Sequence, residues 1–377
     1  MTSIEKHWWS LPGTRRFLDL LIHEVRAGRN LIVRAPDGTP GMRNAIEELL
    51  RRHDSLRFRH VAATEVEQPL AISLFSALRC RREPDELATA NVLASHLPDG
   101  DVIFVDGITS LTWPAWADFA HEYQHGCNAR PEHRRAVFCF LVPGIIAEEP
   151  REDVTLVVRE CHNCFTRLDA MLFVEQLLPQ DASTRTVRHL TVSVAAELAG
   201  TDVPLAAALA TRGMSLIHDP LQVVASIASK MPWNADELTI RPRCCDWIES
   251  YDGRTRLRST ALHIARDIDA LRHRLWHGQI RVLYPFIEEQ RLRFLDQVRD
   301  WLTLPVQTTF GVIEKAIDLE IGPMVYVLRN SRIPRNVWDS LVVLNELRRD
   351  LAHMSPVNPS LLKNAAFVGM CRDTDDR

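Results

Sequence analysis

Short, uninterrupted hydrophobic runs mark the first 160 residues of the chain, and most are followed by a segment with helical spacing. In the first helical segment, at 14–28, Phe17, Leu21 and Val25 recur at helical intervals. The apolar runs lie at 31–33, 57–63, 101–107, 136–144 and 153–158, and further helical segments include 69–78 and 116–125. Continuous apolar strands that alternate with helices are typical of a parallel sheet covered on both faces. We therefore predict a five-stranded α/β domain over residues 1–160.

The pattern becomes mainly helical after residue 160. Residues 165–178 and 186–212 have helical spacing, with a break expected at Gly200, and we predict a small helical lid over 161–214. Residues 215–260 are irregular and contain Pro and Gly, which indicates a connector. Three or four amphipathic segments then predict an all-α bundle over 261–365. We expect the tail, 366–377, to be disordered.

Composition narrows the classes of function. Of 377 residues, 46% are hydrophobic and 25% are charged, which is typical of an ordinary globular protein. The formal net charge of -4 gives no global attraction to nucleic acid or to an anionic membrane. No apolar run is long enough to cross a bilayer, and the first residues do not resemble a secretory signal. The eight scattered cysteines suggest reduced thiols, so we expect a cytoplasmic protein with no membrane association.

Residues 31–53, "LIVRAPDGTPGMRNAIEELLRRH", have the layout of a phosphate-binding loop: a strand, a Gly/Pro loop and a helix. Backbone N–H groups and the positive end of a helix suffice to bind phosphate, so Gly38 and Gly41 are the candidate loop residues. Alignment of Gly41 with the final loop glycine places Met42 where a lysine is needed and Arg43 where a hydroxyl is needed. Arg43 could approach a phosphate but cannot ligate a metal. A plain strand-to-helix loop without a ligand is the alternative.

The third strand ends at Asp106, which could face a metal ion beside such a loop. The next residue is Gly107, where a water-activating glutamate would be expected. One acid of the hydrolytic pair is therefore present and the other is missing. Asp106 could also merely end its strand.

The order of these segments resembles the ASCE division of P-loop NTPases, in particular modules of the AAA+ or STAND type. The resemblance depends on "LPGTRRFLDLL" at 11–21, on Gly38 and Gly41, on Asp106, and on the helices after the fifth strand, and it covers residues 8–212. It implies ATP-driven assembly or switching. Because the lysine, the hydroxyl and the glutamate are absent, we expect a degenerate module that binds ATP or ADP without hydrolysis, or binds no nucleotide.

"LNELRRDLAHM" on the last strong helical segment spaces Arg348 and His353 as Arg-x4-His. An imidazole can transfer the proton of an RNA 2′-hydroxyl, and a guanidinium can stabilise the charge on the phosphorus centre. The segment resembles the signature of HEPN domains over residues 261–365, although Arg349 stands where Asn, Asp or His is usual. The resemblance implies either a metal-independent ribonuclease or a structural bundle that forms a homodimer. A nuclease needs an accessible His353 and RNA; a structural bundle, which we favour, predicts a buried and hydrogen-bonded His353.

Two short motifs have the spacing of metal sites. "CHNCF" contains Cys161 and Cys164, and "HEYQH" contains His121 and His125. Neither has convincing further ligands, so we favour buried free thiols and a solvent-facing helix, and we predict no metal site.

Taken together, the sequence favours a non-hydrolysing regulatory or scaffold protein that acts with a protein partner. Proteins of this make-up recur in bacterial defence systems, so that setting is implied by the resemblance alone. Two enzymatic alternatives stay open: a HEPN-type ribonuclease controlled by the N-terminal module, and an NTPase with an atypical P-loop.

Overall fold

The structure is a computed structural model that describes residues 2–35, 39–53, 56–144, 151–161, 164–179, 184–213, 218–240, 244, 246–308 and 311–375. It divides into two compact units. Unit 1 consists of Met1–Asp169, Thr201–Val203 and Asp236–Arg258. Unit 2 consists of Ala170–Gly200, Pro204–Ala235 and Ser259–Arg377.

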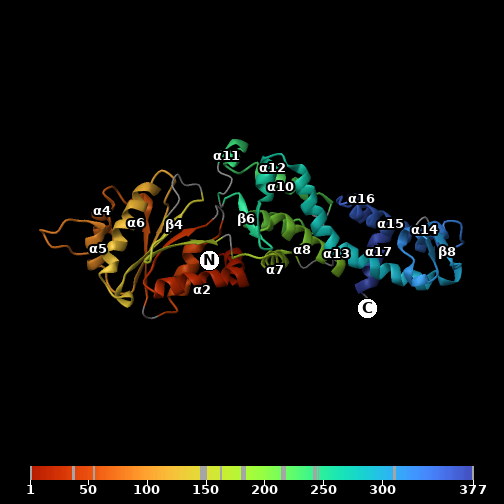
Figure 1. Ribbon diagram of the computed structural model, residues 1–377, viewed down its shortest axis with the longest axis horizontal. Helices are drawn as coiled ribbons and strands as arrows, with labels where there is room; N and C mark the ends of the chain where they lie inside the picture. Colours follow the sequence, from red (N-terminus) through yellow and green to blue (C-terminus); the bar gives the residue numbers. More distant parts are fainter. Residues whose placement is uncertain are drawn as a thin grey trace. The chain divides into compact units, whose positions relative to one another are not determined.

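A five-stranded parallel sheet forms the centre of unit 1 (Figure 1). Its strands are β1 (Asn30–Arg34), β2 (Arg57–Ala62), β3 (Asp101–Asp106), β4 (Val137–Val142) and β5 (Leu156–Glu160), in the order β2-β3-β4-β1-β5. All residues of β1 are buried, and so are most residues of β3 and β4. This burial on both faces explains the uninterrupted apolar runs. The predicted α/β fold class with its five strands is confirmed.

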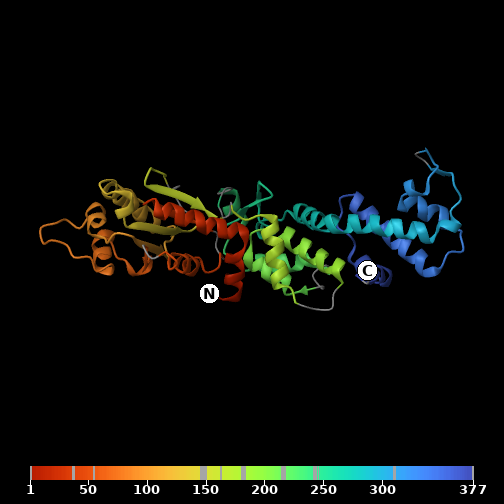
Figure 2. The same ribbon diagram turned by 90° about the horizontal axis from the view of Figure 1, so that it is seen from below.

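Helices cover both faces of the sheet (Figures 1 and 2). On one face, Trp116, Phe119 and Tyr123 pack with Phe138 and Phe140 of β4. The helices of this face are α4 (Leu70–Ala77), α5 (Ala90–His96) and α6 (Trp113–Asn128), and α2 (Pro12–Arg26) and α3 (Met42–Leu50) cover the other. Unit 1 also contains α1 (Ser3–Ser10) and the antiparallel hairpin of β6 (Ile248–Tyr251) and β7 (Arg254–Leu257).

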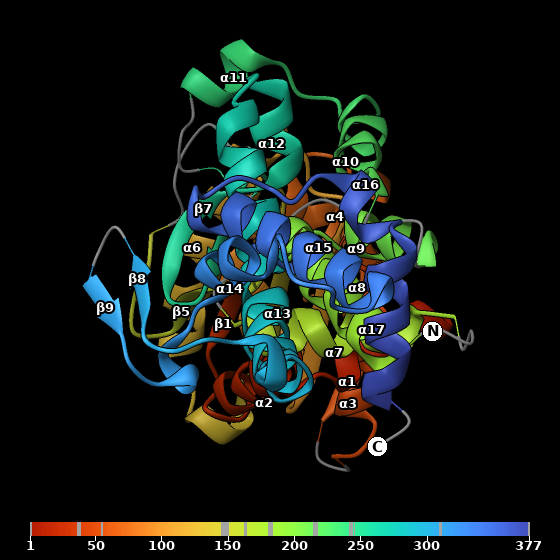
Figure 3. The same ribbon diagram turned by 90° about the vertical axis from the view of Figure 1, so that its right-hand side faces the viewer.

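Unit 2 is mainly helical, as expected for the C-terminal region. Its helices are α8 (Arg185–Ala199), α10 (Pro220–Ala228), α12 (Ser259–Ile264), α13 (Ile268–Gln297), α14 (Ile321–Leu328), α15 (Arg335–Ala352), α16 (Pro359–Leu362) and α17 (Ala365–Asp375), with most of α7 (Arg167–Leu177) and α9 (Val203–Ala210). A short hairpin joins β8 (Val306–Thr308) and β9 (Gly311–Ile313). The long helix α13 packs against α8 and α15 (Figures 1 and 3).

Gly278 permits the close packing of α13 on α8. A Cβ atom at Gly278 would lie 2.8 Å from the Cα atom of Val194, and the Ser193 hydroxyl donates a 2.8 Å hydrogen bond to the Gly278 carbonyl oxygen. The break expected at Gly200 is present, because Gly200 ends α8 with a φ of 54°.

Two stretches are more regular than the sequence suggests. Residues 215–260 contain α10, α11 (Ala235–Ile240) and the β6–β7 hairpin, and they are shared between both units. The described part of the tail, expected to be disordered, is α17. Its apolar residues Phe367, Met370 and Cys371 have helical spacing and are buried, which stabilises the helix. Among the described residues, no helix is long and apolar enough to cross a membrane.

Candidate functional site

The start of α3 forms the centre of the candidate phosphate site. Gly41 is the N-cap residue of α3 and has left-handed backbone angles, φ 55° and ψ 32°. Glycine adopts this conformation without the steric cost that a Cβ brings. Met42, at the position of the missing lysine, is buried in the core. Gly38, the other predicted loop glycine, lies outside the described residues.

Glu5 of α1 lies against this helix start. A Cβ atom at Gly41 would lie 2.5 Å from Cδ of Glu5 and 2.8 Å from its Oε1. Thr2 fixes the side chain through a capping box, in which the Thr2 N–H donates to Oε2 of Glu5 over 2.7 Å. Trp9 also links α1 to the loop before α3, because its indole Nε1–H donates to the carbonyl oxygen of Pro40 over 2.6 Å. A carboxylate at this place is favourable, since the N-terminus of a helix carries a partial positive charge.

Arg43, His60 and Asp106 meet at the carboxyl edge of the sheet. Nε2 of His60 lies 2.9 Å from Oδ1 of Asp106, and Nη1 of Arg43 lies 3.8 Å from Oδ2 of Asp106. Nη1 of Arg43 is also 3.5 Å from Nε2 of His60. The side chains are partly open to solvent: about 28% of Asp106, 31% of His60 and 46% of Arg43 is exposed. Both oxygens of the Asp106 carboxylate therefore face a basic side chain.

This cluster contains two predicted site residues and one that the sequence analysis missed. Arg43 of α3 and Asp106 of β3 come together, although β4 separates β3 from β1, the strand that precedes α3. His60 joins them because β2 pairs with β3 in parallel, with Ala62 opposite Asp106. A sequence signal could have identified His60: it lies two residues before the end of β2, and the adjacent strand β3 ends in an aspartate.

Gly107, the residue after Asp106, lies at a turn whose backbone conformation favours glycine. Its φ of +76° lies in the left-handed region. A Cβ atom added at Gly107 would have the Thr64 side chain as its nearest neighbour, at 3.7 Å. There is room for a Cβ atom, so backbone conformation and not crowding favours glycine at this turn.

A second polar cluster occupies the edge at β1 and β5. The buried Arg34 donates from Nη1 to Oε1 of Glu160 and from Nη2 to the carbonyl oxygen of Gly144, each over 3.3 Å. Asp246, also buried, is so close that a Cβ at Gly144 would lie 2.5 Å from its Oδ2. The buried guanidinium of Arg34 thus has a carboxylate partner in Glu160, as a buried charge requires.

The stretch 11–21, which carries part of the resemblance, has a packing role. The Gly13 N–H at the start of α2 donates to Oδ1 of Asp169 over 2.9 Å, and the Thr14 hydroxyl donates to the carbonyl oxygen of Trp8 over 2.5 Å. Trp8 in turn stacks on Phe165 at a centroid distance of 4.5 Å. The segment thus fixes the first turn of α2 and leaves Gly13 and Thr14 buried.

Within the described residues, no interaction joins Arg348 to His353. The guanidinium of Arg348, on α15, pairs with the carboxylate of Glu320. His353 is the C-cap residue of α15 and is exposed, and its backbone N–H donates to the carbonyl oxygen of Arg349 over 3.1 Å. The expectation of a buried, hydrogen-bonded His353 is therefore wrong. The helix ends at Ala352, and Met354 follows with a φ of 52°, which turns the chain at the surface.

Neither metal-like motif forms a metal cluster in the described part of the chain. The Cys164 thiol donates to the carbonyl oxygen of Cys161 over 3.1 Å, and neither thiol forms a disulfide within the described residues. In α6, Nδ1 of His125 is 2.5 Å from the carbonyl oxygen of His121, so this ring nitrogen forms a hydrogen bond within its own helix.

Comparison with known proteins finds no matching family model and no curated protein of similar sequence. The function of the chain has to be inferred from the geometry of its own residues.

Proposed function

We propose that the chain is a non-hydrolysing regulatory or scaffold protein, built on a degenerate P-loop-like module, that acts together with a protein partner. The observation that carries this proposal is the pairing of Asp106 with His60 and Arg43. A carboxylate that served a magnesium ion would need its oxygens free for the metal. Here a guanidinium and an imidazole lie in their place.

Two further observations support the absence of turnover. Met42 is buried where a lysine would contact phosphate, and Gly107 stands at a left-handed turn where a glutamate would activate water. Loss of a single transition-state contact typically costs roughly 10²–10³ in rate. The parallel sheet itself is compatible with a P-loop-like fold. The setting in bacterial defence rests on the resemblance of the two halves to modules of such systems.

The first test is hydrolysis of ATP by the full chain. We expect no phosphate release above background in the presence of magnesium, whether or not ATP or ADP binds in a separate equilibrium measurement. Turnover that is lost in Asp106→Ala and kept in Asp118→Ala, a change at an exposed acid of α6, would make the protein an NTPase with an atypical loop.

The second test concerns the partner. A protein that copurifies with the tagged chain should form a complex of defined stoichiometry when both are purified and mixed, and the chain should change the activity of that protein. If the purified proteins do not associate, or if the chain has no effect on the activity, the regulatory proposal is wrong.

One observation favours a second candidate, the HEPN-type ribonuclease: His353 is accessible to RNA. The engagement of Arg348 by Glu320 speaks against it. The assay is cleavage of single-stranded RNA by the full chain, alone and as a homodimer if one forms. Cleavage that is lost in His353→Ala and kept in His133→Ala, an exposed histidine of unit 1, would make the protein an enzyme.

A further inference from the structure

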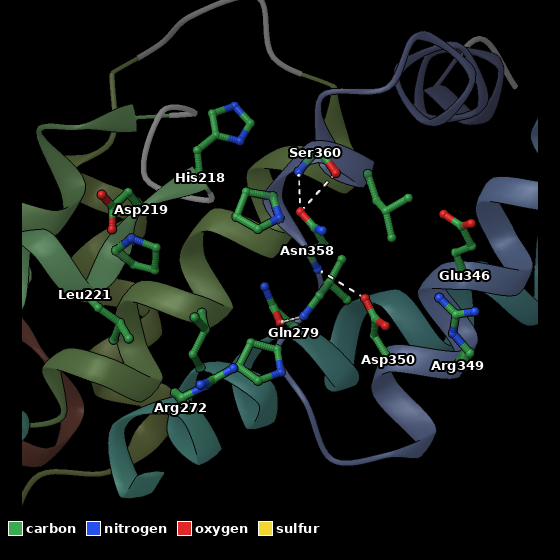
Figure 4. Close-up of a pocket in the computed structure, with 16 residues that line it drawn as sticks. His218, Asp219, Leu221, Arg272, Gln279, Glu346, Arg349, Asp350, Asn358 and Ser360 are labelled. Carbon is green, nitrogen blue, oxygen red and sulfur yellow. Dashed lines mark hydrogen bonds between the residues drawn. The ribbon is translucent and has the colours of Figure 1, made fainter. Parts of the chain in front are cut away.

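A pocket of about 610 Å³ lies in unit 2, and its walls come from α10, α13, α15 and the segment that leads into α16 (Figure 4). Figure 4 shows Arg272 and Arg349 on opposite sides of the pocket, with the carboxylate of Asp350 between them. Asp219 and Glu346 also border the pocket. Because groups of both signs line it, the pocket does not favour one charge of ligand.

Two thiols lie close together in unit 1, where β5 ends. The backbone N–H of Cys164 donates to the carbonyl oxygen of Cys161 over 3.3 Å, a hydrogen bond that closes a four-residue turn. Such a turn holds its first and fourth Cα atoms within about 7 Å of each other, and a disulfide needs a Cα–Cα distance of about 4.4–6.8 Å. Sγ of Cys164 also lies 3.1 Å from the carbonyl oxygen of Cys161. The backbone of the reduced turn therefore already suits a disulfide between the two cysteines.

The two cysteines differ in exposure in a way that suits a redox pair. Cys161 is buried, with 5% of its surface exposed, whereas Cys164 is partly exposed. Thiol–disulfide exchange begins when a thiolate attacks a disulfide that can reach it, and a second nearby thiolate then resolves the mixed disulfide. Cys164 is accessible for the first step, and Cys161 lies beside it for the second.

The turn also packs against the start of α2. A Cβ atom at Gly13 would lie 2.3 Å from the carbonyl oxygen of Cys164, so the two backbones are in direct contact. Asp169, five residues after Cys164, accepts the N–H of Gly13 at its Oδ1 over 2.9 Å. Phe165, the residue after Cys164, stacks on Trp8 of α1. A change of the turn is thus in contact with the segments that hold α1 and α2 in place.

We propose that Cys161 and Cys164 are a redox pair that small-molecule disulfides oxidise to an intramolecular disulfide, and that the disulfide tightens the attachment of α2. The Cys164 thiolate attacks one sulfur of glutathione disulfide, which forms a mixed disulfide and releases one glutathione thiolate. The Cys161 thiolate then attacks the Cys164 sulfur, which forms the protein disulfide and releases the second glutathione thiolate. The two protein thiols are oxidised, one glutathione disulfide is reduced, and the protons of the protein thiols pass to the two glutathione thiolates.

This proposal does not depend on the function proposed above. Its experiment uses the full chain, equilibrated without oxygen in mixtures of reduced and oxidised glutathione, after which free thiols are alkylated and the peptides are identified by mass spectrometry. The disulfide between Cys161 and Cys164 should increase with the share of oxidised glutathione. In Cys161→Ser, the mixed disulfide at Cys164 should accumulate roughly tenfold or more above its level in the unchanged chain, because the resolving thiol is missing. Cys80→Ser, at another partly exposed cysteine, is the matched control and should form the disulfide as the unchanged chain does.

Hydrogen exchange of the backbone around Gly13 measures the effect of the disulfide on α2. In the oxidised chain this exchange should slow roughly threefold or more, because the disulfide restricts opening of the turn on which Gly13 packs. In Cys164→Ser, treatment with glutathione disulfide should leave the exchange unchanged.

Three outcomes would overturn the proposal. The first is a folded chain that forms no disulfide between Cys161 and Cys164 at any ratio of the two glutathione forms. The second is a preferred disulfide of either cysteine with a different cysteine of the chain. The third is exchange around Gly13 that is unchanged or faster after oxidation.

Discussion

The side chain of Glu5 lies so close to Gly41 that the two residues restrict each other. The contact joins the first helix of unit 1 to the start of α3, and an added Cβ atom at Gly41 would require the Glu5 side chain to shift. Because Gly41 also has a left-handed backbone, two separate effects favour glycine at this position.

Substitution of Gly41 by alanine should therefore destabilise the protein more than the same change at Gly253. Gly253 has a φ of +73° but no atom within 4 Å of an added Cβ, so Gly253→Ala should cost only the conformational strain, about 1–2 kcal/mol. Gly41→Ala should cost the same conformational strain and, in addition, the free energy needed to displace the Glu5 side chain. Urea unfolding measures both free energies, and the additional cost at Gly41 should shrink in a Glu5→Ala background. Equal costs in both backgrounds would contradict a direct contact.

Two helical glycines of unit 2 should respond to alanine with opposite signs. In a helix, alanine is usually more stable than glycine by roughly 0.5–1 kcal/mol, and we expect this gain for Gly369→Ala, which has no neighbour within 4 Å of the new Cβ. Gly278→Ala should instead destabilise by roughly 1–3 kcal/mol, because its Cβ meets the backbone of α8. Thermal unfolding distinguishes the two signs. A stabilised Gly278→Ala variant would mean that α13 and α8 are further apart.

The buried thiol of Cys139 should weaken the fold at alkaline pH. Burial raises the pKa of this thiol from 9.0 to about 12. Between these values the unfolded chain loses the proton and the folded chain keeps it, so stability falls as pH rises above 9, by up to roughly 1.4 kcal/mol per pH unit. In Cys139→Ala this contribution is absent. The stability difference between the unchanged chain and this variant, measured from pH 8 to 11, should decrease with pH; a constant difference would show that the thiol titrates alike in both states.

His218, beside the pocket of unit 2, should have the opposite dependence. Burial, and secondly the charge of Lys363, lower the pKa of its imidazole below 6.5. The unfolded chain then binds the proton more readily, so this contribution is present above about pH 6.5 and is lost as pH falls. In Lys363→Gln the pKa of His218 should rise. An NMR titration of the imidazole Cε1 proton measures this directly, and an unchanged pKa would exclude Lys363 as a cause.

Local patterns along the chain were enough to predict the main elements of unit 1. The runs at 101–107 and 136–144 correspond to β3 and β4, because strands buried on both faces must be apolar throughout and this requirement is visible without any partner. The spacing of Phe17, Leu21 and Val25 likewise predicted α2, and Gly200 predicted the end of α8, because each signal is local. The tail differs from the expectation of disorder, because α17 is stabilised by burial against α8 and α15, which local patterns in the tail do not show.

The packing of the chain decides which of the predicted residues come together in a site. Arg43 and His60 reach Asp106 because the strand order and parallel register bring together the ends of distant segments. Glu5 of α1 lies beside Gly41, far from it in the sequence, and Arg348 pairs with Glu320 although its spacing suggested His353. Which partner a side chain contacts depends on the distances between groups and on the rotamers that are accessible in the folded chain. The periodicity of the sequence gives neither the distances nor the rotamers. The chain therefore encodes its elements locally, while the pairing of their charged ends depends on how they pack.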